Sequence, residues 1–425
     1  MRILHIIQRY WPTQGGAEVY LREISTRLVG DGHSVTVATT DAGDFEYFWN
    51  PRKEALPSGE TQHHNVRILR FPVRHLPAMG LIYPAIRRLL LLLSECPVNA
   101  TALQFRLARF TPWVPELWHW LETTDEPFDL VAGMTICFEP LLEAGLRFAQ
   151  RRGIPFVIYP LTHLGAGEEP GKDSLSRFYT MSHQIELVRQ SDAVIAQTPA
   201  ERDFYLQHGV PPERIHVIGP GVNPDEVLGG DGERFRKRHE LNGPIVFTIT
   251  KMSYNKGVMH TIEAMARLWS RGCTAHLVLA GDMLDPFRRY FQGLPEEVRK
   301  RILLLGTIGD EEKRDLLAAG DVLVMPSRTD SFGIVYLEAW LYGKPVIGAQ
   351  AWGITDVIED GKDGLLVPFG DIEALAEAIA YLLDHPEKAA AMGQRGRAKV
   401  LSQHTWDRKY PQIREVYLQL ACSSI

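Results

Sequence analysis

Short apolar, β-branched runs recur along the chain and alternate with longer amphipathic segments. Near-continuous apolar runs of this length are typical of strands buried on both faces, as in parallel sheets. The predicted strands lie at 2–7, 34–39, 66–71, 129–133, 155–159, 192–197 and 214–218 in the first half, and at 244–250, 275–281, 301–306, 321–326, 345–349 and 364–368 in the second. Both halves therefore show the same alternation of predicted strands and longer amphipathic segments.

The segments between these runs have helical periodicity. One apolar stripe after the first run consists of Ala17, Tyr20, Leu21, Ile24 and Leu28, and a glycine-containing turn follows it. Strands that alternate with helices form right-handed βαβ units. We therefore predict an α/β fold with two Rossmann-like, doubly wound parallel-sheet domains that face a cleft.

The domain boundary is predicted from length and composition. A chain of 425 residues exceeds what one hydrophobic core usually supports. Residues 219–233 are rich in Gly, Pro and acids, as is typical of a linker. We predict an N-terminal domain over 1–222, joined by a C-terminal helix over 405–425, and a second domain over 223–404.

Composition narrows the class of protein. The chain is 45% hydrophobic and 23% charged, and its net charge of −6 gives no indication of a nucleic-acid partner. Four cysteines are scattered without CxxC spacing, which predicts neither a zinc site nor a disulfide framework and favours a cytoplasmic compartment. The apolar run at the N-terminus is too short for a signal peptide and fits a first strand.

The stretch most like a membrane segment is GLIYPAIRRLLLLLSEC, residues 80–96. Pro84, Arg87 and Arg88 interrupt it, and its leucine run is far below the ~20 residues that span a bilayer. We expect a buried helix here. An interfacial helix, which would place the protein peripherally at the inner membrane face, stays open as the alternative.

Ligands of open α/β sheets bind beyond the carboxyl ends of the strands. After the first predicted strand, Gly15 and Gly16 directly precede a helix, so backbone can approach a ligand and N–H groups can face an anion. A plain flexible turn is the alternative. The chain contains no GxGxxG, which counts against a dinucleotide fingerprint.

Two lysines follow the first predicted strand of the second domain. Lys251 and Lys256 flank a short loop ahead of a helix predicted over 257–269. Two ammonium groups beside a helix N-terminus would suit a diphosphate. Surface lysines are usually only solvated, but a position at the carboxyl end of a strand favours function.

Two acids follow the strand at 321–326. Asp330 lies in the loop, Ser331 is expected to cap the next helix, and Gly333 leaves backbone N–H groups unshielded. Glu338, about two turns beyond Ser331, lies near the same helix face. Because carboxylates hold vicinal diols through paired hydrogen bonds, the arrangement suits a hexose, a diphosphate and a ribose, the parts of a nucleotide sugar.

One histidine follows the strand at 155–159. A lone histidine is more often structural than catalytic, but the loop that carries His163 should face the same cleft. We therefore expect His163 to contact the ligand.

These motifs together resemble a known family, the retaining glycosyltransferases of the GT-B fold, family four. The resemblance rests on GGAEVYLREISTRLVGDGHSVTVAT, on GDVLVMPSRTDSFGIVYLEAWLYGKPVIG and on GITDVIEDGKDGLLVPFGD. It covers most of the chain, while residues 41–125 match nothing usable. Elements that bind the acceptor tend to vary in that region.

The resemblance implies roles for four charged residues. Lys256 takes the place of the family's diphosphate lysine, and Lys251 stands where the family usually has Arg, which keeps the charge but loses the bidentate fork. Glu338 matches the second acid of the Glu-(seven residues)-Glu signature and would hold the ribose. Asp330 takes the first position, where Glu is usual, and would hold hexose hydroxyls with one methylene less reach.

Further contacts follow from the same resemblance. The amides of Phe332, Gly333 and Ile334 would approach the sugar and the phosphate, and Ile308 would border the base. His163 resembles the histidine that contacts the transferred sugar. The paired glycines of the N-terminal segment would face the phosphates or the acceptor across the cleft.

The implied reaction transfers a hexose from a nucleoside-diphosphate sugar to an acceptor hydroxyl with retention, by a front-face mechanism, as a step of glycan biosynthesis. No cofactor is expected, and the absence of a D-x-D triplet fits a metal-independent reaction. The acceptor, whether lipid, glycan or small molecule, stays open. The alternatives are a sugar phosphorylase, a nucleotide-sugar epimerase, a dehydrogenase and a non-catalytic nucleotide-sugar binder.

Overall fold

The computed structural model describes residues 1–423, which form two compact units. The first unit comprises Met1–Thr162, Ser174–Gly219 and the C-terminal stretch from Tyr410. The second comprises His163–Asp173 and Pro220–Lys409. The segment 163–173, which the sequence places in the N-terminal domain, thus belongs to the second unit by its contacts, and the last two residues of the predicted helix over 405–425 lie outside the described residues.

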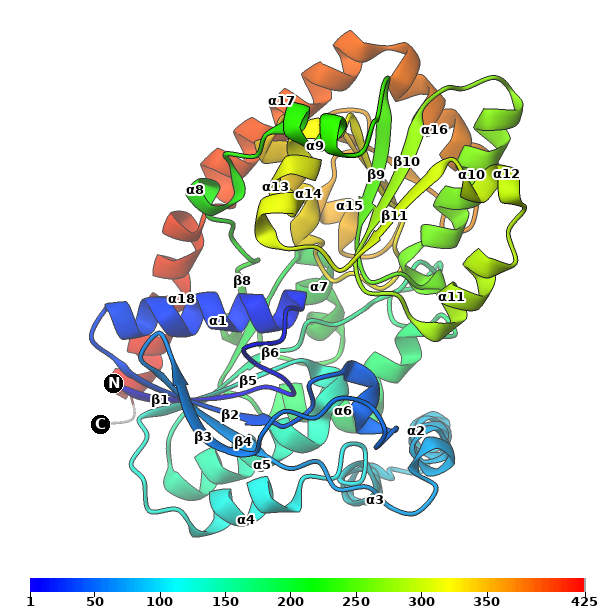
Figure 1. Cartoon of the computed structure of the whole chain (residues 1–425). Coiled ribbons are helices and arrows are strands. Elements are labelled where there is room, and N and C mark those ends of the chain that lie inside the picture. The colour runs from blue at the N-terminus through cyan, green and yellow to red at the C-terminus, as the bar shows by residue number, and fades with distance from the viewer. Residues whose placement is uncertain (424–425) are drawn as a thin grey trace. The chain divides into compact units, whose positions relative to one another are not determined.

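The first unit is built on an eight-stranded sheet of order β3-β4-β2-β1-β5-β6-β7-β8. Helices cover both faces, with α1 and α18 on one side and α4 and α5 on the other (Figure 1). Its strands are β1 (Arg2–Ile6), β2 (Ser34–Thr40), β3 (Gly59–His63), β4 (Val66–Phe71), β5 (Leu130–Met134), β6 (Phe156–Tyr159), β7 (Ala193–Ala196) and β8 (Ile215–Val217). Its helices are α1 (Gly16–Gly30), α2 (Met79–Glu95), α3 (Thr101–Ala108), α4 (Pro115–Thr123), α5 (Glu139–Arg152), α6 (Ser182–Arg189) and α7 (Pro199–Gln207).

The predicted doubly wound α/β architecture is confirmed, with one addition. All thirteen predicted runs form strands that pair in parallel, but β3 was not predicted and pairs with β4 in the antiparallel sense. Its sequence, GETQH, is polar and mostly exposed because the strand lies at the sheet edge. A polar edge strand lacks the apolar pattern by which the others were recognised.

The second unit is built on a six-stranded parallel sheet of order β11-β10-β9-β12-β13-β14. Its strands are β9 (Ile245–Ile249), β10 (His276–Ala280), β11 (Ile302–Gly306), β12 (Val322–Met325), β13 (Val346–Ala349) and β14 (Gly364–Val367). Its helices are α8 (Pro224–Val227), α9 (Gly232–Arg238), α10 (Val258–Ser270), α11 (Asp285–Gln292), α12 (Glu296–Arg299), α13 (Asp310–Ala319), α14 (Ile334–Leu341), α15 (Ile354–Val357), α16 (Ile372–Asp384) and α17 (Pro386–Gln403), and α18 (Trp406–Ser423) crosses the boundary at 409/410.

Two apolar cores lie on the two faces of this second sheet. One contains buried side chains of α9, α13 and α14, including Trp340, and the other contains side chains of α10, α11 and α16, including Ile262. Residues 245–248 of β9 and all of β12 are fully or almost fully buried. These cores fix the strand ends from which the loops of the site extend.

The predicted linker over 219–233 is only partly irregular. Residues 224–227 form α8, and α9 begins at Gly232. Gly230 packs so closely on α13 that a Cβ atom there would lie 2.1 Å from the carbonyl oxygen of Arg314. The amide of Asp231 donates to Asp315 Oδ1 at 2.7 Å. The glycines therefore permit close packing rather than flexibility.

Residues 80–96 form most of α2, which is neither fully buried nor long and apolar enough to cross a membrane, as is true of every helix in the described residues. Its side chains at Leu90 and Leu91 are buried, whereas Leu81 and Leu92 are 77% and 64% exposed. The expectation of a buried helix was therefore wrong for one face of α2.

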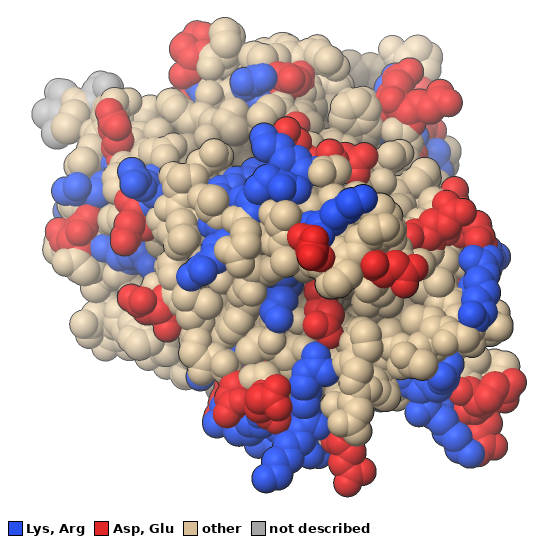
Figure 2. All heavy atoms as spheres, turned by 90° about the horizontal axis from the view of Figure 1, so that it is seen from above, with Lys and Arg blue, Asp and Glu red and all other residues tan. Residues whose placement is uncertain are grey.

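The surface charge is mixed. Over the face drawn in Figure 2, acidic and basic side chains are interspersed.

Candidate functional site

The predicted donor residues of the second unit gather where the strand order reverses. β9 pairs with β10 on one side and with β12 on the other, so the loops after β9 and β12 leave the sheet side by side. The first loop carries Lys251 and a short 3₁₀ turn, η5 (Tyr254–Lys256), and the second carries residues 326–333. Such a switch point leaves a crevice for ligands at the carboxyl ends of the strands.

Lys256 and Asp330 form an ion pair across these two loops. Lys256 Nζ lies 2.7 Å from Asp330 Oδ1 and also donates to the carbonyl oxygen of Thr329 at 3.3 Å. Both side chains are largely buried, with exposed fractions of 21% and 18%. The two residues that the sequence assigned to phosphate and hexose are thus direct neighbours.

The carboxylate of Asp330 has an unused acceptor. Burial acts to raise its pKa, but the ammonium of Lys256, with smaller contributions from Ser327 and His163, outweighs that effect and lowers the pKa below its ordinary value. Asp330 Oδ2 is buried and accepts no hydrogen bond from any described residue. Because a buried acceptor without a donor costs free energy, this oxygen is suited to a ligand hydroxyl.

His163 lies close enough to Lys256 and Asp330 for both charges to shift its pKa. Burial, the larger cause, and the charge of Lys256 together lower its pKa to about 4, although Asp330 acts in the opposite direction. The imidazole is therefore neutral near pH 7. The loop that carries His163 is held by Trp352, whose amide and indole donate to the carbonyl oxygens of Gly165 (2.8 Å) and Gly167 (2.9 Å).

Backbone at the start of α14 differs from the prediction. Ser331 does not cap the helix, because the N-cap is Gly333 in a left-handed conformation, φ 84°, with no side-chain cap. Tyr336 explains the glycine, since a Cβ atom at Gly333 would lie 2.5 Å from that ring. None of the N–H groups of Phe332, Gly333 and Ile334 donates to another described residue. The helix therefore begins with open donors.

Glu338 has a partner that the sequence reasoning missed. Its carboxylate is 12% exposed and lies 2.7 Å from Lys313 Nζ of α13. Lys313 stands in an acid-rich helix start, GDEEKRD, where a single lysine gave no signal. Lys251, predicted to bind phosphate, lies at the end of β9 with its Nζ 3.8 Å from Asp282 Oδ2.

Arg328 is a second cation missed by the sequence reasoning, although it stands in the loop that carries Asp330. Its guanidinium donates to Asn255 Oδ1 at 2.9 and 3.1 Å and lies over the ring of Phe369. Its amide donates to the carbonyl oxygen of Asn255 at 3.0 Å. Arg328 therefore ties the loop after β12 to the turn that presents Lys256.

The remaining predicted contacts of the second unit differ in exposure. Phe332 is buried against His404, with ring centroids 5.5 Å apart, so its side chain belongs to the core and only its backbone is available. Ile334 and Ile308 are half-buried at the edge of the same core. Their predicted contacts with sugar and base stay predictions.

Gly15 and Gly16 belong to the first unit. Gly15 is the N-cap of α1, and a Cβ atom there would lie 2.1 Å from Glu18 Oε2, whereas the space beside Gly16 is open. Glu18 is buried and paired with Arg9 at 2.8 Å. A side chain at the first glycine would therefore displace the carboxylate of Glu18 from its place beside Arg9, whereas the space beside the second glycine is open. Within residues 1–423, no group of three or more His, Cys, Asp or Glu side chains could hold a metal ion.

Comparisons with known proteins extend over both units. Residues 15–221 match the family described as glycosyl transferase 4-like domain, and residues 231–399 match glycosyl transferases group 1. An alpha-maltose-1-phosphate synthase of Mycolicibacterium smegmatis is 30% identical over 302 residues, 63% of this chain and 74% of that protein. A D-inositol 3-phosphate glycosyltransferase of Acidothermus cellulolyticus is 26% identical over 95% of this chain and 85% of its own. For an alpha-D-kanosaminyltransferase of Streptomyces kanamyceticus, the match spans 62% of that protein.

Solved structures share the fold. HepE of Anabaena, crystallised with UDP and glucose, has a TM-score of 0.69 at 21% identity and covers 99% of this chain and all of its own. Sucrose-phosphate synthase of Thermosynechococcus elongatus has a TM-score of 0.73 at 21% identity, with 99% of both chains covered. With the family matches over both units, the chain belongs to the GT-B glycosyltransferases of family four.

Proposed function

We propose that the protein is a retaining hexosyltransferase that uses a nucleoside-diphosphate sugar and needs neither a metal ion nor a cofactor. The observation that carries this proposal is Asp330, a buried carboxylate with one oxygen on Lys256 and the other without a donor. A hexose hydroxyl would satisfy the second oxygen. If Lys256 moves away from Asp330 when the donor binds, the adjoining phosphate would neutralise the lysine in place of the carboxylate.

The diphosphate would lie at the start of α14. Lys256, Lys251 and the open N–H groups of residues 332–334 supply positive charge and donors there. Such preorganised groups stabilise the charge that grows on the leaving phosphate in the transition state. Lysines and a helix N-terminus would thus take the role that a cation has in other transferases.

The ribose would bind at Glu338. Its carboxylate is paired with Lys313, so a ribose diol must compete with that ion pair or share the carboxylate with it. The nucleotide would then lie between α13 and the loop after β12. HepE, whose fold this chain shares, binds UDP and UDP-glucose.

The proposed chemistry is a front-face displacement. The acceptor oxygen forms a bond to C1 on the side from which the phosphate departs, the bond from C1 to the phosphate oxygen breaks, and the acceptor proton passes to a phosphate oxygen. His163, neutral near pH 7, can donate or accept a hydrogen bond at a sugar hydroxyl without adding charge. The protein mainly positions the reactants and stabilises charge.

A binding panel tests the proposed site. UDP, GDP and ADP, each free and as the glucose or mannose derivative, are titrated while the melting temperature is recorded. We expect nucleotides of one base to raise the melting temperature. Glu338→Ala should weaken binding of that nucleotide about tenfold, because the ribose diol loses its paired acceptor. The matched change Lys313→Ala should bind the nucleotide more tightly, because it removes the competing cation. If neither variant differs from the parent, Glu338 does not hold the ribose.

A non-catalytic nucleotide-sugar binder is distinguished by turnover. An active transferase commonly hydrolyses its donor slowly without an acceptor, so release of the nucleoside diphosphate is measured by coupled assay. We expect release that depends on protein concentration and is lost in Asp330→Ala. Binding without release in any acceptor mixture would favour the non-catalytic reading.

The acceptor side has one structural indication. On α2, Leu81, Leu89 and Leu92 are exposed, and Arg88 lies among them. A helix with an apolar stripe and a basic residue is suited to the surface of an anionic bilayer. We therefore place this face of α2 against the membrane, which makes a lipid-linked or membrane-proximal acceptor the first to test.

Vesicle sedimentation tests this placement. Parent protein should sediment with phosphatidylglycerol vesicles and much less with phosphatidylcholine vesicles. Leu81→Ser with Leu92→Ser should abolish sedimentation, whereas Leu401→Ser, an exposed leucine of α17, should not. Equal sedimentation of the two variants would exclude α2 as the contact.

A further inference from the structure

We propose that the first unit holds a second anion site, a pocket between α4 and α5 that binds a phosphate group. The pocket has a volume of about 550 Å³, within the range of small-molecule sites. It is lined by Arg109, Trp118, Leu121, Glu122, Ala144, Arg147, Gln150 and Arg151. Nothing in the proposed transferase chemistry uses these residues.

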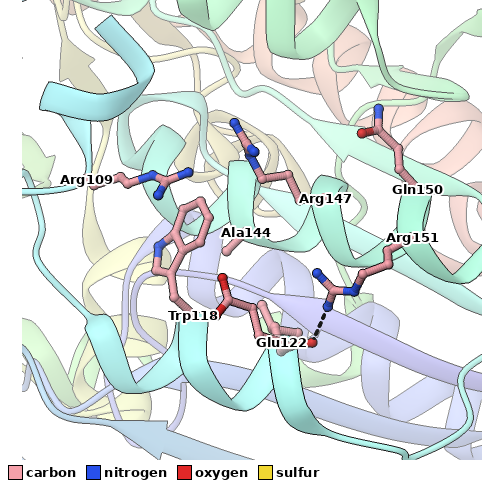
Figure 3. A pocket seen from close by; sticks show the side chains of 8 residues that line it. Arg109, Trp118, Glu122, Ala144, Arg147, Gln150 and Arg151 are labelled. Carbon is pink, nitrogen blue, oxygen red and sulfur yellow. Dashed lines mark hydrogen bonds between the residues drawn. The ribbon is translucent and has the colours of Figure 1, made fainter. Parts of the chain in front are cut away.

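Three guanidinium groups surround this space (Figure 3). Arg109, just after α3, and Arg147, on α5, extend toward each other from opposite sides, and Arg151 lies nearer Glu122. The three come from separate turns or segments, so their convergence is a property of the fold. Guanidinium forks match the oxygens of a phosphate, which makes arginine the usual residue at such sites.

Each arginine is held in place by a contact that leaves other N–H groups available. Arg109 lies 3.9 Å above the Trp118 ring and donates to Glu143 Oε1 at 3.3 Å. Arg147 Nε donates to the same oxygen at 2.7 Å, while its two terminal nitrogens have no partner among residues 1–423. Arg151 Nη2 donates to the carbonyl oxygen of Leu121 at 2.6 Å. The groups are therefore preorganised but not saturated.

The charge balance favours an anion that also carries hydroxyl groups. The buried carboxylate of Glu143 is shared by two arginines, and Glu122 is the one acid of the pocket lining, so three positive charges face two negative ones. Glu122 and Gln150 offer acceptors and donors for hydroxyls. The ligand class is a phosphate monoester or diester on a polyol, either a free sugar phosphate or a phospholipid headgroup.

The location separates this pocket from the carboxyl edge of the sheet. β5 ends at Met134 and α5 begins at Glu139 on that edge, so Arg147 and Arg151 lie about 12 and 18 Å farther along the helix, at 1.5 Å per residue. Ligands of α/β sheets bind at the carboxyl edge. A phosphate between α4 and α5 would thus act as an effector or an anchor, not as donor.

The test measures phosphate binding while the nucleotide site is blocked. Inorganic phosphate, glucose 6-phosphate and vesicles with or without phosphatidylglycerol are titrated onto full-length protein saturated with UDP, and onto Lys256→Ala. We expect binding of at least one phosphate source in both cases. Arg147→Gln with Arg151→Gln should weaken it about tenfold or more, since each removes charged hydrogen bonds.

Arg152→Gln is the matched control. Arg152 is the neighbouring residue of α5, but it pairs with Asp125 and does not line the pocket, so its change alters net charge as much as either single change, Arg147→Gln or Arg151→Gln, without touching the site. Soluble phosphates that bind without vesicles indicate an effector. Vesicle binding that Arg147→Gln with Arg151→Gln weakens, without binding of soluble phosphates, indicates a headgroup, whereas vesicle binding lost only in Leu81→Ser with Leu92→Ser reports the contact of α2. No binding from any source, or equal weakening by the control and either pocket variant, would overturn the proposal.

Discussion

Two buried acids, one in each unit, follow a strand at the carboxyl edge of a sheet, and they differ in how completely they are paired. Glu139, at the start of α5, accepts from Arg87 and from His183 Nε2 at 3.0 Å through Oε1, and from Gln184 at 3.3 Å through Oε2. Asp330 accepts from Lys256 through one oxygen and from no described residue through the other. We call the network of Glu139 closed, because both of its carboxylate oxygens accept hydrogen bonds, and that of Asp330 open, because one oxygen accepts none from a described residue.

The comparison shows that a lowered pKa alone does not identify a functional acid. For both carboxylates burial raises the pKa, and a cation overcomes that effect, Arg87 in one case and Lys256 in the other. What separates the two is the acceptor that stays unused. Closed networks define structure, whereas a buried oxygen without a donor is suited to a ligand.

The largest effect is expected from breaking the closed network. Glu139→Gln leaves Arg87 buried without its carboxylate, and loss of one partner of a buried ion pair typically costs about 3–5 kcal/mol. Urea unfolding of the purified variant measures this loss. Glu186→Gln, an exposed acid of α6, should change the free energy of unfolding by well under 1 kcal/mol. Similar stabilities for both variants would show that the network is not structural.

Removing the cation of the open pair should lower the rate and also the stability, because the largely buried carboxylate of Asp330 loses its partner. Lys256→Ala removes charge beside the leaving diphosphate, and loss of one such group typically lowers kcat about 100-fold or more. Initial rates with the preferred donor measure it, and Lys300→Ala, at the exposed C-cap of α12, is the control. A variant that loses stability but keeps its kcat would place Lys256 in a structural role.

A smaller effect is expected when the open acid loses only its charge. Asp330→Asn keeps the shape but offers a sugar hydroxyl a weaker acceptor, so we expect kcat/KM to fall about tenfold. The melting temperature should fall as well, because Lys256 is left largely buried without its carboxylate, so rates are compared at a temperature at which both proteins are folded. An unaltered kcat/KM would mean that Asp330 Oδ2 does not contact the substrate.

The smallest effect concerns pH. The folded pKa of His163, about 4, lies below its unfolded value of 6.5, so the unfolded state binds the extra proton between these values. Stability contributed by the neutral imidazole is therefore complete above pH 6.5 and decreases as pH falls toward 4. At pH 5.5 the difference is about 1 kcal/mol. Urea unfolding of His163→Asn at pH 7.5 and 5.5 should show a flatter dependence than the parent, and equal slopes would contradict the assignment.

Much of the fold could be predicted because buried parallel strands have continuous apolar sequences. The missed strand β3 is polar at an edge, where no burial imposes a pattern. The neighbourhood of Lys256 and Asp330 followed from their positions after β9 and β12, but their direct pairing depends on the register of those strands. No spacing in the sequence encodes that register.

Other parts of the site depended on packing between distant segments. Ser331 was expected to cap α14, but the chain turns through Gly333 because the ring of Tyr336 occupies the space beside it. Lys313 meets Glu338 only because α13 packs beside α14, and a lysine among acids suggests nothing about that contact. Such pairings lie beyond the range of local patterns.

The division of the chain has a consequence for how the protein can be cut. The segment 163–173 belongs to the second unit, so the backbone passes from one unit to the other at 162/163, 173/174, 219/220 and 409/410. A polypeptide of residues 220–409 alone would contain Lys256 and Asp330 but lack the segment that carries His163. Cleavage at a single peptide bond therefore cannot separate the two units. A second unit produced by itself would need residues 163–173 supplied as a separate peptide.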